Sequence, residues 1–207
     1  MLKPDRRSLG MKIPSLALCL LVLACSDSGN AVTAQDRHAL ASARAETQVS
    51  ATFTVTSSAF AAGGAIPLRH SAYGDGVSPA LSWSGVPTGA RSLALMMEDP
   101  DATSARPFVH WLAWNVDPTA GDLPEGIQPA GGAVAGLRQG RTSRDSVGYF
   151  GPRPHGSSPH HYHFQLFALD ASLDLADGAD REALLAAMNG HVLAKGDLVG
   201  LFAQPRD

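Results

Sequence analysis

The stretch that decides the fold is residues 92–116, SLALMMEDPDATSARPFVHWLAWNV. It consists of two apolar runs, 92–98 and 108–116, separated by a polar segment that contains two prolines. Apolar runs of this length, bounded by turn-forming residues, predict two strands joined by a loop. Successive strand residues point to opposite faces, so counting by twos places Asp99 at the end of a buried row that contains Leu93, Leu95 and Met97.

The second strand carries a histidine among apolar residues. By the same count, His110 shares a face with Leu112, Trp114 and Val116. A single histidine in such a position is more often a hydrogen-bonded core residue than a ligand-binding one. His110 therefore becomes a candidate site residue only together with other polar groups.

Outward from this stretch the chain continues to favour strands. Period-two or β-branched patterns predict strands at 49–56, 81–83, 162–169 and 198–203, separated by breakers at 63–64, 87–89 and 118–121. One helix is predicted at 180–189, with Asp180 as its N-cap and Gly190 after its end. The region 118–148 has little apolar rhythm and is interpreted as a surface excursion. The predicted fold is mainly β, with one short C-terminal helix packed on the sheet.

A third polar cluster lies before the strongest strand. The Gly- and Pro-rich segment GYFGPRPHG, residues 148–156, precedes His160, which by parity shares a face with Tyr162, while His161 and His163 point to the other face. Glycines such as Gly151 would allow backbone N–H groups to approach an anion closely.

These separated motifs together resemble a known family. The strings DPDA (99–102), HW (110–111), GYxGPxPxG (148–156), HxY (160–162) and FALD (167–170) occur in the order typical of the phosphatidylethanolamine-binding protein family, in its bacterial Raf-kinase-inhibitor-like branch. The resemblance extends from about Phe53 to Gln204. It implies a β-sandwich-like fold with an anion pocket near one end.

Carried over position by position, the resemblance places these residues in the pocket: Asp99, Asp101, His110, Gly151, Pro152, His160 and Tyr162. We expect the histidines and loop amides to hold an anionic ligand. We expect Asp99 and Asp101 to accept histidine N–H groups and keep the imidazoles cationic near neutral pH. Alternatively, one aspartate binds the amine of a zwitterionic headgroup. Thr103 departs from the family pattern, in which proline is common.

The first 25 residues read as an export leader. Basic residues precede the apolar run 13–24, which is too short to span a bilayer as a mature helix. The run ends at Cys25 in a sequence similar to a bacterial lipobox, which predicts lipidation of Cys25 and anchoring in the cell envelope. Cleavage after Ala34 is the alternative. Residues 26–48 are expected to be a flexible spacer, and 49–207 the folded domain.

Composition excludes several classes of function. The formal net charge of −3 provides no basic surface for nucleic acid. Both cysteines, Cys19 and Cys25, lie in or at the edge of the leader, so the domain has no thiol for a disulfide or a zinc site.

The sequence therefore predicts an exported, non-catalytic protein that binds a small anionic or zwitterionic ligand without a cofactor. Three alternatives remain: an envelope protein-interaction or inhibitor module, a metal site built from the two histidines and two aspartates, and a hydrolase. The hydrolase would use Ser157 or Ser158 with His160 and Asp99. No metal ligand is assigned, and the sequence does not determine the oligomeric state.

Overall fold

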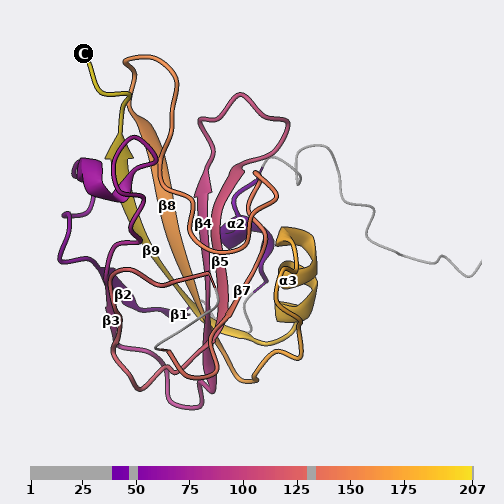
Figure 1. The fold of residues 1–207 in the computed structure, drawn as a ribbon. Coiled ribbons are helices and arrows are strands. Elements are labelled where there is room, and N and C mark those ends of the chain that lie inside the picture. The colour runs from indigo at the N-terminus through magenta and orange to yellow at the C-terminus, as the bar shows by residue number, and fades with distance from the viewer. Residues whose placement is uncertain (1–38, 47–50, 130–133, 207) are drawn as a thin grey trace, which may run out of the picture. The chain divides into compact units, whose positions relative to one another are not determined.

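The structure is a computed structural model that describes residues 39–46, 51–129 and 134–206 (Figure 1). The chain divides into two units, 1–31 and 32–207. The first unit, and with it the predicted leader and Cys25, lies outside the described residues. All the elements named below belong to the second unit.

Two β-sheets form the framework, so the mainly β prediction is confirmed. The larger sheet has the strand order β1-β9-β8-β4-β5-β7 and the smaller one the order β2-β3-β6. All neighbouring strands are antiparallel except β1 and β9. The strands are β1 (Ala51–Thr52), β2 (Thr54–Thr56), β3 (Leu81–Ser84), β4 (Ser92–Asp99), β5 (Phe108–Val116), β6 (Asp122–Leu123), β7 (Arg138–Gln139), β8 (His160–Leu169) and β9 (Val192–Phe202).

The larger sheet is covered on both faces, which produces two apolar layers. Phe164 and Trp83 belong to the layer between the two sheets. Phe167 and Trp114 belong to the layer on the other face, where α2 (Ala41–Arg44) and α3 (Arg181–Met188) pack. Figure 1 shows β2 and β3 on one side of the large sheet and the helices on the other. The central strands are buried on both faces, and every residue of β4 is buried.

Regular alternation holds in β4 and β8. Leu95 and Met97 of β4, and Phe164 and Leu166 of β8, all lie in the layer between the sheets, as strand parity predicted. The pairing of Leu95 with Leu166 and of Met97 with Phe164 continues this alignment across the two strands. Asp99 and His160 stand at the same end of these strands.

The alternation fails in β5. Met97 pairs with Trp111 and Glu98 pairs with Val109, which leaves His110 as an extra residue in a β-bulge. The bulge turns His110 toward Tyr162 of the inter-sheet layer, with ring centroids 5.1 Å apart. The predicted face for His110 was therefore wrong, because Leu112 and Trp114 pack on the helix side of the sheet.

Helix α3 confirms the predicted C-terminal helix. Asp180 is its N-cap, and its carboxylate accepts a hydrogen bond from the Ala183 N–H at 2.9 Å. Leu184 and Met188 are fully buried against the sheet. The following strand begins at Val192, six residues before the predicted start at 198, and Gly196 and Asp197 lie within it.

A short N-terminal segment packs on the helix side of the sheet, where a flexible spacer was expected. Residues 39–46 include α2, and Ala41 is fully buried. The Glu98 carboxylate accepts the Ala41 N–H at 2.7 Å and also binds the Arg181 guanidinium, which donates to the Ala39 carbonyl. Gln165 accepts the Ser42 N–H at 2.7 Å. In residues 39–46 the spacer interpretation therefore does not hold, because buried polar groups fix the segment's backbone.

The described residues of the excursion at 118–148 include two strands that the sequence did not indicate. They supply β6 to the small sheet and β7 to the large one. Gln139 of β7 is buried, accepts the Trp111 indole N–H at 2.7 Å and donates to the Gln128 carbonyl at 2.6 Å. In the described part of the chain, no helix is both long and apolar enough to cross a membrane.

Candidate functional site

A cavity of about 370 Å³ opens beside the ends of β4, β5 and β8. It is bounded by the loop after β4, the start of β5, the segment before β8 and the first residue of β8. The residues that line it are Asp99, Ala102, Thr103, Ser104, Phe108, His110, Arg144, Phe150, Arg153, Pro154, His155 and His160. Three of the seven predicted site residues, Asp99, His110 and His160, are therefore brought together here.

His110 is held in an aromatic surround. Its ring lies 4.7 Å from Phe108 and is stacked at 5.6 Å on Phe150, and only 3% of the residue is exposed. Its Nδ1 lies 2.8 Å from the Phe150 carbonyl oxygen, and the Phe150 N–H donates to the His110 carbonyl at the same distance. A carbonyl can only accept, so Nδ1 carries the proton.

Burial lowers the pKa of His110 to about 4, although the Phe150 carbonyl and the Asp99 carboxylate oppose that shift. The ring is therefore neutral near pH 7, and Nε2 has a free lone pair. The expectation of a cationic imidazole was wrong for His110, because desolvation by the aromatic rings outweighs the effect of the aspartate.

The Asp99–His160 pair forms the second polar element. Asp99, 3% exposed, accepts from His160 Nδ1 at 2.8 Å through one oxygen and from the Asp101 N–H at 2.8 Å through the other. The second contact closes a short turn after β4. Asp99 thus fixes the ring orientation of His160 in the way expected for it.

Asp101 lies elsewhere. It is exposed, and its carboxylate accepts both the backbone N–H and the ring Nδ1 of His161, at 2.8 and 2.7 Å. These contacts lower its pKa despite partial burial. Because His161 points away from the cavity, Asp101 anchors the loop to β8 and does not contact the two cavity histidines.

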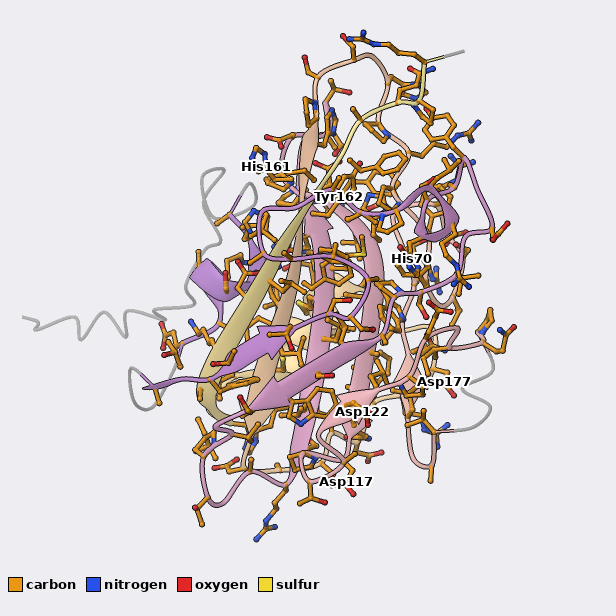
Figure 2. All side chains as sticks on the ribbon, turned by 90° about the vertical axis from the view of Figure 1, so that its left-hand side faces the viewer. His70, Asp117, Asp122, His161, Tyr162 and Asp177 are labelled. Atoms are coloured by element: carbon orange, nitrogen blue, oxygen red, sulfur yellow. The ribbon has the colours of Figure 1, made fainter. Side chains whose placement is uncertain are left out.

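Tyr162 lies behind the cavity wall. Its ring meets His110 edge-on and stacks at 6.5 Å on His160, but Tyr162 is not among the lining residues. Burial, reinforced by the nearby Asp99 carboxylate, raises the pKa of Tyr162, so the hydroxyl stays protonated. That hydroxyl is buried and, among the described residues, has no partner at hydrogen-bonding geometry. His161, the neighbour of Tyr162, is exposed near the same end of β8 (Figure 2).

Gly151 and Pro152 have a packing role in the loop. A Cβ on Gly151 would collide with the backbone of residues 70–72, so glycine permits this close approach. The Pro152 carbonyl accepts the Ala72 N–H at 3.0 Å. The N–H of Gly156, a further glycine of this loop, donates to the Gln204 side-chain oxygen at 2.8 Å. Neither Gly151 nor Pro152 lines the cavity, so the expected anion-binding nest is not seen there.

Two arginines at the cavity were not singled out from the sequence. The guanidinium of Arg144 lies 5.2 Å from the Phe150 ring centroid, and that of Arg153 lies 5.9 Å from the Tyr73 ring centroid. Both side chains line the cavity, and neither forms an ion pair with a carboxylate among the described residues. The sequence contained only a weak signal for them, because Arg153 is one basic residue within the Gly-rich loop 148–156 and Arg144 lies shortly before that loop.

The residues of the alternative chemistries do not converge here. Ser157 and Ser158 are exposed and do not line the cavity. Within the described ranges, no three His, Cys, Asp or Glu side chains are placed to hold one metal ion. A second cavity, which shares Ser104 with the first, is lined partly by Arg181 and Glu182, and these two side chains already bind each other.

Comparison with known proteins identifies the family. The family model described as "Phosphatidylethanolamine-binding protein" matches residues 56–203. The chain belongs to this family. It is 45% identical over 139 residues to a UPF0098 protein of Methanothermobacter thermautotrophicus, covering 67% of this chain and 91% of that protein.

Two further family relatives add structural and cellular context. The crystal structure of Escherichia coli YbcL, described as "a new member of the mammalian PEBP family", matches with a TM-score of 0.70 at 29% identity, covering 75% of this chain and all of that one. A Mycobacterium tuberculosis protein named "Putative lipoprotein LppC" is 39% identical over 150 residues, covering 72% of this chain and 71% of that protein. The fold predicted from the resemblance is thus confirmed.

Proposed function

We propose that this protein is a non-catalytic receptor for a small phosphate-bearing ligand, bound in the cavity between His110 and His160. The observation that carries the proposal is the convergence of Arg144 and Arg153 with these histidines in one cavity of about 370 Å³. Guanidinium groups bind phosphate through charge-assisted hydrogen bonds, and the aromatic wall limits competition from water. Small-molecule sites typically combine an apolar lining with a few convergent polar groups in this way.

Titration calorimetry with inorganic phosphate and phosphoethanolamine tests the proposal. Each charge-assisted hydrogen bond contributes about 1.5–3 kcal/mol. We therefore expect Arg153→Gln or Arg144→Gln to weaken binding about 10- to 100-fold. Arg138→Gln is the matched control, because that exposed arginine pairs with Asp177 and does not line the cavity. Absence of binding by the unaltered protein, or equal losses in all three variants, would refute the proposal.

Catalysis is not part of the proposed function. The cavity offers Ser104 as its serine, and that hydroxyl donates to the Arg106 carbonyl at 2.6 Å. A nucleophilic serine needs a base within hydrogen-bonding reach, whereas this hydroxyl is engaged by a backbone carbonyl. Labelling by a fluorophosphonate probe that Ser104→Ala or Ser157→Ala abolishes would overturn this part of the proposal.

We also propose that the protein is exported and anchored in the envelope through Cys25. The support is the leader pattern of residues 1–25 together with the similarity to LppC. Membrane fractionation tests it: the wild-type protein should sediment with membranes, and Cys25→Ser should move it to the soluble fraction. Identical fractionation of the two forms would argue against lipidation. Cys19→Ser serves as the control.

A further inference from the structure

The cavity contains hydrogen-bond acceptors where a receptor for a bare anion would place donors. Nδ1 of His110 donates to the Phe150 carbonyl, which leaves Nε2 of the neutral ring as an acceptor. The Asp99 carboxylate, 3% exposed, is a second acceptor that lines the same cavity. An oxyanion oxygen without a proton would be repelled by the Nε2 lone pair of His110 and by the negative charge of the Asp99 carboxylate.

Donors occupy other parts of the cavity. Arg144 and Arg153 donate only and are always charged. His160 donates its Nδ1 proton to Asp99, so its Nε2, the ring atom left for a ligand, is an acceptor in the neutral ring and a donor only in the protonated ring. A ligand that satisfies both sets must accept from the arginines and also donate at least one proton to Asp99 or His110.

We infer that the cavity selects an oxyanion that carries its own proton, namely a phosphate monoester or inorganic phosphate, over sulfate and over phosphodiesters. The inference rests on the proposed function and specifies its ligand class. A phosphate monoester has a second pKa near 6 and bears a proton in mildly acidic solution. Neither sulfate nor the phosphoryl group of a phosphodiester carries a proton in this pH range. An intact phosphoethanolamine headgroup keeps its ammonium donors but lacks the phosphoryl proton, so we expect it to fit less well than free phosphoethanolamine.

The decisive experiment compares matched ligand pairs on the unaltered protein by calorimetry at pH 5.5–6. The pairs are inorganic phosphate with sulfate, and phosphoethanolamine with glycerophosphoethanolamine, at equal ionic strength. We expect the proton-bearing member of each pair to bind at least about tenfold more tightly, as one well-placed hydrogen bond provides. Equal affinities within the pairs would overturn the inference while the proposed function stands. No binding by any of the four would overturn both.

The pH dependence separates the ligand's proton from that of the protein. The titratable groups facing the cavity are Asp99 from β4, His110 from β5, His160 from β8 and His155 from the loop. Any loss of positive charge by the protein between pH 5.5 and 8 lowers its affinity for sulfate and for phosphate ligands alike. Phosphoethanolamine should lose affinity more steeply than sulfate, because it also loses its own proton. Parallel pH curves for these two ligands would contradict the inference.

Two aspartate variants provide a second, independent readout. Asp99→Asn replaces an acceptor by a group that also donates, so the preference for phosphate over sulfate should fall toward one. Asp101→Asn is the matched control, since that side chain pairs with His161 outside the cavity. Its preference should equal that of the wild type. An unchanged preference in a folded Asp99→Asn protein would rule out Asp99 as the selecting acceptor.

Discussion

Replacing His110 by glutamine should alter how the stability of the protein depends on pH. In the fold, burial lowers the pKa of His110 from 6.5 to about 4. Below pH 6.5 the unfolded chain therefore binds a proton that the folded chain excludes, and acidification favours unfolding. The contribution of the neutral His110 ring to the free energy of unfolding is therefore fully present above pH 6.5 and is lost as the pH falls to about 4. A difference of 2.5 pKa units corresponds to about 3 kcal/mol.

Urea unfolding at pH values from 8 to 4 measures this contribution as a difference between two proteins. The free energy of unfolding of His110→Gln should fall less on acidification than that of the wild type, by about 3 kcal/mol over the whole range. Loss of the one side-chain hydrogen bond, from His110 Nδ1 to the Phe150 carbonyl, shifts the free energy of unfolding of the variant by a constant and leaves this slope unaffected. His161→Gln, a change at an exposed histidine, should follow the wild type to within about 1 kcal/mol. The free energy of unfolding of the wild type minus that of His110→Gln should become more negative toward acid. A value that is independent of pH, or that becomes more positive toward acid, would refute a neutral buried His110.

Three further predictions concern the interior. Arg181→Met leaves the Glu98 carboxylate buried without its guanidinium and should cost about 3–5 kcal/mol of stability, or about 6–20 °C in Tm by calorimetry. Adding Glu98→Gln to this variant should recover part of the loss. A double variant whose loss equals the sum of the two single losses would contradict this. Tyr162→Phe removes a buried hydroxyl that has no partner at hydrogen-bonding geometry among the described residues, so stability to urea should stay within about 1 kcal/mol of the wild type or rise; a larger loss would reveal a partner. Gly200→Ala would bring a Cβ within 2.6 Å of Ile66 and should cost about 1–3 kcal/mol by urea unfolding, whereas an unchanged midpoint would show that the side chains of Ile66 and Phe60 can shift without strain.

The sequence predicted those parts of the fold and site that depend on regular pairing. Asp99 and His160 end two adjacent strands that alternate without interruption near the site, so parity placed each of them correctly within its own strand, and the family resemblance brought the two together. Asp180 as the N-cap of α3 was predictable for a similar reason, because capping depends on residues three apart in the chain.

Contacts between distant segments could not be predicted in this way. Arg153 reaches the cavity from a loop that packs on residues 70–72, and Arg144 from a turn that hydrogen bonds between Ser143 and Val109 hold to β5. No local pattern encodes either contact. The docking of residues 39–46 depends on Glu98, Gln165 and Arg181, which come from three separate elements. A segment of alanine and serine looks like a linker unless its backbone partners are known.

The bulge in β5 connects the fold to the site. In a regular strand His110 would lie on the face of Leu112 and Trp114, against the helices, whereas one extra residue turns it toward Tyr162 and Asp99. The same inward turn places its ring among Phe108 and Phe150, and this burial removes its charge. An acceptor at this point of the cavity is therefore a consequence of strand pairing. A substitution that made β5 regular would remove the acceptor even with every cavity residue retained.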